Sequence, residues 1–162
     1  MKQQSMPDKA GLDASFPKKR ISAGAVIRSS SGELLIVKPT YREGWLLPGG
    51  VCESNESPAM ALVREIDEEL GLVCGIVKLL CVDYLSPADG FSEALHFLFE
   101  CKPLSADDIA NIRIDTTEIA DYRFCRDEEA CVQLVPAIAR RLTFLESGGN
   151  YCENGLPATT LG

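Results

Sequence analysis

The segment "PGGVCESNESPAMALVREIDEELGL", Pro48 to Leu72, decides the fold and the chemistry that this chain can support. A double glycine opens the segment, and "REIDEEL" near its end places four carboxylates beside one arginine. Ser57 followed by Pro58 is a helix-start signal, because a serine hydroxyl caps backbone N–H groups and proline has none to lose at the first helical position. Gly71 suits the left-handed residue that ends a helix. We therefore predict a helix over residues 58–70.

A helical wheel separates the acids of this helix from its apolar residues. At about 100° per residue, Glu65, Glu68 and Glu69 share one face, whereas Asp67 points away from it toward solvent. The apolar stripe that is predicted to face the core consists of Ala59, Leu62, Val63, Ile66 and Leu70. Three carboxylates on one face repel one another, and such clustering becomes favourable when Mg²⁺ or Mn²⁺ lies between them. The alternative is that the acids form an ordinary solvated helix face.

The surroundings of the helix favour the metal site over the solvated face. The Gly49-Gly50 pair allows the backbone to approach a ligand closely, and Glu56 lies where it can reach Arg64. The positions that match the pattern G-x5-E-x7-R-E-U-x-E-E-x-G-U, where U is a bulky aliphatic residue, are Gly50, Glu56, Arg64, Glu65, Ile66, Glu68, Glu69, Gly71 and Leu72. This segment resembles the Nudix box, the signature of the Nudix hydrolases, with no departure at a fixed position.

The resemblance implies a hydrolase that uses Mg²⁺ or Mn²⁺. Its substrate would be a nucleoside diphosphate linked to another moiety, such as ADP-ribose, a nucleotide sugar or a nucleoside triphosphate, and a phosphoanhydride bond would be cleaved. The implied metal ligands are Glu65, Glu68, Glu69 and the carbonyl of Gly50. The resemblance also implies that Arg64 orients these glutamates and that Glu56 anchors Arg64.

Residues outside the box supply further candidates. The general base is either a box glutamate or an acid from a later loop, for which Glu118 in "DTTEIADYRF" is our candidate; it is equally well an ordinary solvated residue at the start of a strand. Lys38, Arg42 and Trp45 are candidates for substrate contact, since cations bind phosphate and an indole stacks on a base. The only histidine, His96, alternates with apolar neighbours and is predicted to be structural.

The remaining sequence predicts an α/β (α+β) fold, specifically an α/β/α sandwich with a mixed β-sheet flanked by helices. Residues 21–27 and 33–39 read as strands joined in an antiparallel hairpin, and residues 135–147 read as an amphipathic helix. The tail after Gly148 holds little helix or strand signal. The predicted organisation is a flexible N-terminal segment (1–20), a Nudix hydrolase domain (21–146) and a C-terminal tail (147–162).

Composition limits the partners of the chain. It has 162 residues, 46% of them hydrophobic, and a net charge of −8. Such a charge disfavours binding to a nucleic acid polymer or to an anionic membrane, so an anionic small-molecule nucleotide would need a cation as mediator. Seven scattered cysteines without a CxxC motif predict reduced thiols.

The N-terminus has no signal-peptide core, so we expect a cytoplasmic protein, with a homodimer left open. The alternative function is a non-catalytic module that binds a nucleotide or a protein partner on the same scaffold. The usual mark of such a module is a degraded box, whereas this box is intact.

Overall fold

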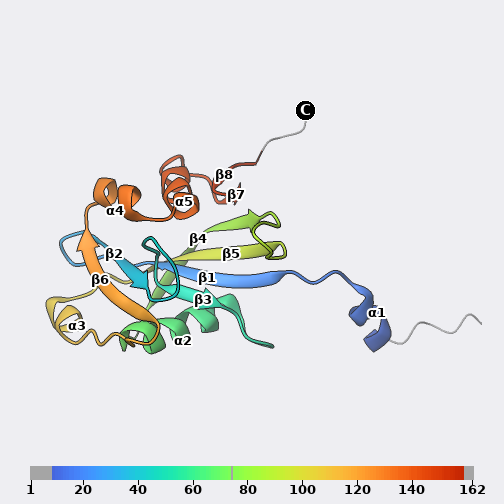
Figure 1. The fold of residues 1–162 in the computed structure, drawn as a ribbon, viewed down its shortest axis with the longest axis horizontal. Helices are drawn as coiled ribbons and strands as arrows, with labels where there is room; N and C mark the ends of the chain where they lie inside the picture. Colours follow the sequence, from blue (N-terminus) through green and yellow to red (C-terminus); the bar gives the residue numbers. More distant parts are fainter. Residues whose placement is uncertain (1–8, 74, 159–162) are drawn as a thin grey trace, which may run out of the picture.

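The computed structural model describes residues 9–73 and 75–158. Figure 1 shows the elements in space. In chain order they are α1 (Lys9–Ser15), β1 (Arg20–Val26), β2 (Leu34–Pro39), β3 (Gly49–Val51), α2 (Pro58–Leu70), β4 (Ile76–Leu85), β5 (Ala94–Cys101), α3 (Ala106–Ala110), β6 (Ile119–Cys125), α4 (Asp127–Gln133), α5 (Pro136–Glu146), β7 (Tyr151–Glu153) and β8 (Leu156–Pro157).

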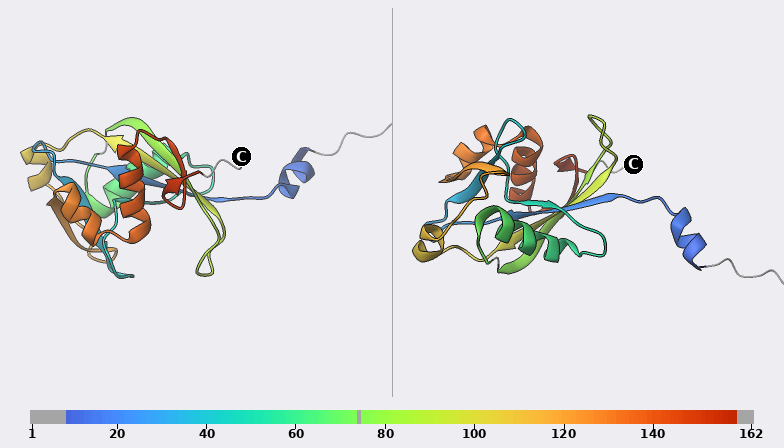
Figure 2. Two further views of the ribbon diagram at one scale, coloured as in Figure 1. Left: turned by 90° about the horizontal axis from the view of Figure 1, so that it is seen from above. Right: turned by 60° about the horizontal axis from the view of Figure 1, so that its bottom comes forward.

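A mixed sheet organises these elements into layers. The main sheet has the strand order β3-β1-β5-β4-β7-β8, and a second, two-stranded sheet pairs β2 with β6. Strand β1 runs parallel to β5 and β4 runs parallel to β7, whereas the other pairs are antiparallel. Helix α2 lies on one side of the main sheet and α4 and α5 lie on the other (Figures 1 and 2). The predicted α/β/α sandwich with a mixed sheet is confirmed.

The alternation of β1 divides the interior into two apolar clusters. Ala23 and Ala25 belong to the cluster beneath α2, whereas Val26 belongs to the cluster beneath α4 and α5. Helix α2 adds Leu62 and Ile66, both fully buried, to the first cluster. Small side chains on β1 thus face bulky ones on the helix, and this packing fixes the helix that carries the acids across β1 and β3.

Helix α2 begins and ends at the predicted residues. The Ser57 hydroxyl accepts a hydrogen bond from the Met60 N–H at 3.2 Å, Pro58 is the first helical residue, and Gly71 ends the helix with a φ of 65°. The prediction that Val63 faces the core is wrong, because this side chain is 40% exposed. The reason is that α2 packs on β1 and β3, so the side of the helix that carries Val63 extends beyond them.

Two predictions about strands are also wrong. Strands β1 and β2 do not form the predicted hairpin, since they lie in different sheets and β2 pairs with β6. Beyond the end of β1, an isolated bridge joins Arg28 to Leu34, and the Leu35 N–H donates to the Ile27 carbonyl at 2.9 Å. The chain after Gly148 is not irregular, since β7 and β8 extend the main sheet beside β4. An apolar pattern identifies a strand but not its partner, and a three-residue strand is too short to show a pattern.

The N-terminal segment and the cysteines were also predicted from the sequence. Helix α1 lies within the segment that was predicted to be flexible, and residues 1–8 lie outside the described residues. The described cysteines are free thiols, and Cys74 lies outside the described residues. None of the helices in the described part of the chain is long and apolar enough to cross a membrane.

A buried ion pair joins α5 to the sheet and to the C-terminal strands. Nε and Nη2 of Arg141 lie 2.8 and 2.7 Å from the same carboxylate oxygen of Asp83, and both side chains are almost fully buried. The Gly155 N–H donates to the other oxygen of Asp83 at 3.1 Å. One carboxylate on β4 therefore holds α5 and the turn between β7 and β8.

We expect Asp83→Ala to lower the free energy of unfolding by about 3–5 kcal/mol, because the charge of Arg141 would remain buried without a partner. Asp121→Ala is the matched control, since it removes a carboxylate 3.7 Å from Arg123 where both side chains are exposed. The control substitution should lower the free energy of unfolding by no more than about 1 kcal/mol. Urea denaturation measures both losses, and equal losses would contradict the assigned role of Asp83.

Candidate functional site

Arg64 is the centre of the hydrogen-bond network on α2. Its Nε and Nη2 donate to the two oxygens of Glu56, each at 2.9 Å, which is the contact that the sequence predicted. Its Nη1 donates to Glu65 at 2.8 Å and to Glu68 at 2.9 Å. The Arg64 hydrogen bonds, with one from the Glu53 N–H, lower the pKa of Glu56 to about 2, so this carboxylate stays charged. Arg64 therefore connects the loop before α2 to the acids on the helix.

The double glycine leaves room for the acids of α2. Gly49 has a φ of 133°, and a Cβ at this residue would lie 2.2 Å from the carbonyl oxygen of Ala23. Its N–H donates to Glu69 Oε2 at 3.0 Å. A Cβ at Gly50 would lie 2.3 Å from the carboxyl carbon of Glu65. Glycine is required at residue 49, whereas a side chain at residue 50 would displace the carboxylate of Glu65, so the absence of both side chains lets the helix acids reach the loop.

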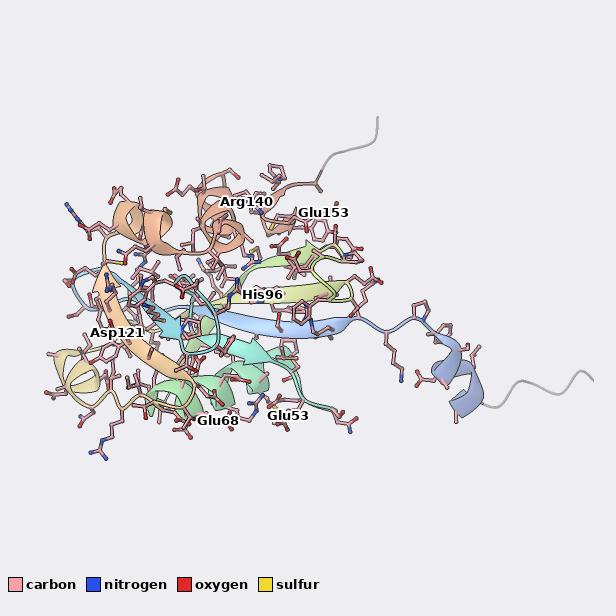
Figure 3. All side chains as sticks on the ribbon, in the orientation of Figure 1. Glu53, Glu68, His96, Asp121, Arg140 and Glu153 are labelled. Atoms are coloured by element: carbon pink, nitrogen blue, oxygen red, sulfur yellow. The ribbon has the colours of Figure 1, made fainter. Side chains whose placement is uncertain are left out.

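Burial distinguishes Glu69 from the other acids. Its side chain is 8% exposed, and this burial raises its pKa to about 8, with further contributions from the charges of Glu65, Glu118 and Glu68. Burial also raises the pKa of Glu65. Glu68 is the exposed member of the three, and Figure 3 shows it along the α2 side of the molecule. A nearby positive charge would stabilise the ionised forms of Glu65 and Glu69.

The loop before β6 brings Glu118 to the same cluster. The Asp115 N–H donates to the backbone carbonyl of Glu69 at 3.1 Å, which attaches this loop to the end of α2. The Glu118 carboxylate is exposed, and its charge raises the pKa of Glu65 as well as that of Glu69. The same carboxylates act on the phenol of Tyr41, whose pKa is raised first by burial and next by the charge of Glu69. The sequence indicated Glu118, whereas nothing in its pattern assigned Tyr41 to the acids.

The three predicted substrate-contact residues lie on β2 and in the loop that follows it. Lys38 lies on β2 opposite Asp121 of β6, and Arg42 is exposed in the following loop. Trp45 is half-buried, and the guanidinium of Arg123 lies 4.0 Å from its ring centroid. Within the described residues, no hydrogen bond or ion pair joins any of these three side chains to the glutamates of α2.

A cavity of about 150 Å³ opens beside the glycine loop, and sequence reasoning did not find it. Its lining includes Ser22, Gly24, Leu47, Gly49, Gly50, His96 and Arg141. His96 Nδ1 lies 2.8 Å from the hydroxyl of Ser22. Burial and then the charge of Arg141 lower the pKa of His96 well below its usual range, so the imidazole is neutral. In Figure 3 the label of His96 lies beside the strands of the main sheet.

The acids of α2 and the loop carbonyl are the kind of ligand that a hard divalent cation takes. In residues 9–73 and 75–158, no three His, Cys, Asp or Glu side chains converge on a single point. Arg64 accounts for this arrangement, because it draws Glu65 and Glu68 toward its own Nη1. The raised pKa of Glu69 and the close approach of the Glu65 carboxylate to Gly50 are the two observations that fit a cation at this place.

Comparison with known proteins agrees with this geometry. The NUDIX domain family matches residues 18–146. The chain belongs to the Nudix family. A MutT-like protein of Streptomyces ambofaciens is 32% identical over 99 residues, which is 61% of this chain and 60% of that protein. An RNA pyrophosphohydrolase of Pseudomonas aeruginosa is 34% identical over 61 residues, or 38% of each chain. The chain thus covers less than two thirds of the length of these curated relatives.

A solved structure shows that the fold is shared as well. The MutT protein from Methanosarcina mazei Go1 superposes with a TM-score of 0.70 at 20% identity, over 83% of this chain and 98% of that one. The Nudix box of this chain therefore lies in the Nudix fold.

We expect the metal-free protein in EDTA to lose stability as the pH rises from about 4.5 toward 8, because the folded state holds the Glu69 proton more tightly than the unfolded state does. The loss attributable to this group is at most about 1.4 kcal/mol per pH unit. In the Glu69→Gln variant the glutamine side chain does not titrate, so the part of the pH dependence of stability that Glu69 causes should be absent. Unfolding free energies of the two proteins measured across this range test it, and parallel curves would refute it.

Proposed function

We propose that the protein is a Mg²⁺- or Mn²⁺-dependent pyrophosphohydrolase. Its substrate is a nucleoside diphosphate linked to another moiety, such as ADP-ribose, a nucleotide sugar or a nucleoside triphosphate, and a phosphoanhydride bond is cleaved. The observation that carries the proposal is the acid face of α2, which the pairing of Arg64 with Glu56 holds against Gly49 and Gly50. Membership of the Nudix family supports it.

Each residue of the network has a role in this proposal. Glu65, Glu68 and Glu69 would hold the ion, together with the carbonyl of Gly50. When bound, the ion neutralises charge on the phosphate oxygens and lowers the pKa of a water. Arg64 positions Glu65 and Glu68 through its Nη1, and its two bonds to Glu56 keep the guanidinium from rotating.

The general base is either a box glutamate or Glu118. Glu118 is exposed, lies at the start of β6 and acts electrostatically on both Glu65 and Glu69, which places its charge near the acid face. A carboxylate at this place could accept a proton from an attacking water. We retain Lys38, Arg42 and Trp45 as candidate substrate contacts, since cations bind phosphate and an indole stacks on a base.

The cavity beside the glycine loop suits a neutral part of the substrate. Leu47 and Ile138 give it apolar walls, and the neutral imidazole of His96 offers a hydrogen bond without charge. A base or sugar fits such surroundings better than a phosphate, because a phosphate buried there would lack sufficient positive charge around it. The diphosphate would then extend over Gly49 and Gly50 toward the acids.

Several earlier expectations stay predictions alongside this function. They are the division of the chain at residues 20 and 146, the cytoplasmic location and the absence of binding to nucleic acid polymers. The usual mark of the alternative, a non-catalytic binding module, is a degraded box, whereas the contacts of Arg64 with Glu56, Glu65 and Glu68 are all present here.

Turnover should require Mg²⁺ or Mn²⁺ and should fall by at least about a hundredfold in Glu68→Gln and Glu69→Gln, since each removes a ligand charge. Asp67→Asn is the matched control, because Asp67 is exposed on the same helix and points away from the acid face. Product identity is scored over nucleoside triphosphates, ADP-ribose, nucleotide sugars, dinucleoside polyphosphates and RNA with a 5′-triphosphate. Metal-independent turnover, or full activity in both glutamine variants, would exclude the proposed site.

Glu118→Gln should lower kcat at neutral pH while leaving KM and the melting temperature nearly unchanged, if Glu118 is the base. A fall of about 10²-fold to 10⁴-fold is the usual range for a lost general base. The pH profile of kcat in the variant should also lose its acidic limb. Wild-type kcat with an unaltered profile would assign the base to a box glutamate instead.

A further inference from the structure

A hydrogen-bonded pair of side chains, Ser22 and His96, lines the cavity beside the glycine loop. Ser22 of β1 lies directly opposite His96 of β5, and the Ser22 hydroxyl lies 2.8 Å from His96 Nδ1. Both residues belong to the wall of the cavity of about 150 Å³. The pair is therefore in the place where a ligand that enters this cavity would contact the sheet.

The second ring nitrogen of His96, Nε2, is available to a ligand. In residues 9–73 and 75–158, no hydrogen bond involves Nε2. Every fully buried side-chain nitrogen or oxygen in this part of the chain has a partner, so Nε2 must be accessible. The ring lies over Gly24, which also lines the cavity, since a Cβ at Gly24 would come within 2.9 Å of Nε2. An accessible nitrogen without a protein partner can bond a ligand.

Asp83 is the acid nearest to His96 along the sheet, and it is already paired. Strands β1, β5 and β4 lie side by side, and Asp83 of β4 is directly opposite His96 (Figure 1). One oxygen of Asp83 accepts from Arg141 and the other accepts from the Gly155 N–H. Burial and then the charge of Arg141 lower the pKa of His96 well below its usual range, so its imidazole stays neutral.

A neutral imidazole beside a hydroxyl has two hydrogen-bond arrangements. When Nδ1 of His96 carries the proton, it donates to the Ser22 oxygen, and Nε2 offers a lone pair to the cavity. When the Ser22 hydroxyl donates to Nδ1 instead, Nε2 carries the proton and offers an N–H. Because a serine hydroxyl rotates, this pair can present either an acceptor or a donor to a ligand.

The base of a nucleotide is the ligand whose chemistry matches this wall. Leu47 and Ile138 line the cavity with apolar surface, on which a flat ring packs. A sugar fits less well, because each of its hydroxyl groups would need a partner in a cavity that has few polar groups. The edges of the bases present amino groups as donors and carbonyl groups as acceptors, which are the two partners that Nε2 can serve.

We propose that the Ser22–His96 pair recognises the base of the nucleotide, with Nε2 bonding the base edge and Ser22 adjusting the tautomer of the imidazole. An amino group is accepted through one tautomer and a carbonyl group through the other, so adenine and hypoxanthine nucleotides should bind about equally well. This inference rests on the proposed function only in taking the ligand to be a nucleotide. It concerns binding, which needs neither a metal nor turnover.

Nitrogen NMR of the imidazole tests the contact in the wild type, because His96 is the only histidine of the chain. Adenosine and inosine 5′-monophosphate carry an amino and a carbonyl group at the same ring position, and each is titrated into the protein in EDTA. The Nε2 signal should move toward the unprotonated form with the adenine nucleotide and toward the protonated form with the hypoxanthine nucleotide. Ribose 5-phosphate, which has no base, should leave it unchanged. A signal that neither nucleotide moves, or that both move alike, would overturn the proposal.

Ser22→Ala tests the adjustment of the tautomer. Without the hydroxyl, a proton on Nδ1 would lack an acceptor, which is less favourable than an unpartnered lone pair, so the proton should stay on Nε2. Calorimetry should then show binding of adenosine 5′-monophosphate weakened about tenfold relative to inosine 5′-monophosphate. Ser92→Ala is the matched control, because Ser92 is exposed and lies outside the cavity wall, and it should bind both nucleotides as the wild type does. Wild-type selectivity in a folded Ser22→Ala variant would contradict the role of Ser22.

Turnover separates this inference from the proposed function. Nucleotide-dependent movement of the Nε2 signal in a protein that hydrolyses no nucleotide with Mg²⁺ or Mn²⁺ would support base recognition and reject the hydrolase. Hydrolysis of nucleotides by a protein whose Nε2 signal never moves would support the hydrolase and reject base recognition by His96. The NMR measurement uses the wild type, so its result stands even if a variant fails to fold.

Discussion

The guanidinium of Arg64 is the group on which the geometry of the site depends. It lies on α2 between the loop that contains Glu56 and the helix acids Glu65 and Glu68, and it donates to all three. A planar, permanently charged donor suits this position, because it can bind one carboxylate with two parallel bonds while its third nitrogen serves the other two. A lysine would supply one charge and could not keep the loop and the helix in register.

The second constraint is the close approach of α2 to the glycine loop. Helix α2 presents Leu62 and Ile66 to the small residues of β1, and this packing brings Glu69 next to the Gly49 N–H. The approach has a cost, since it buries a carboxylate and raises its pKa to about 8. A fold that stabilises only itself would have an apolar or amide side chain here. The cost is understandable if a cation offsets it, and this is the physical reason for considering the buried acid functional.

The same placement of α2 has a consequence on its far side. A helix seated across β1 and β3 leaves Met60 and Val63 without a cover, because β4 lies farther along the sheet.

The sequence by itself determined the elements whose signals are local. Ser57, Pro58 and Gly71 set the limits of α2 through capping and backbone preference, and the 3.6-residue period placed Glu65, Glu68 and Glu69 on one face. The class of fold followed from the order of helices and strands, since layered packing allows few arrangements of them. Even the contact between Glu56 and Arg64 could be predicted, because both belong to one short segment with a strict spacing.

Only the tertiary structure decided the features that depend on distant segments. The partner of β2, the burial of Glu69, the position of Val63 and the cavity that contains His96 each involve residues far apart in sequence. An apolar pattern states that a side chain prefers to be buried but not which neighbour buries it. The electrostatics of the acids arise in the same way, because a pKa is set by burial and by charges that the fold brings together.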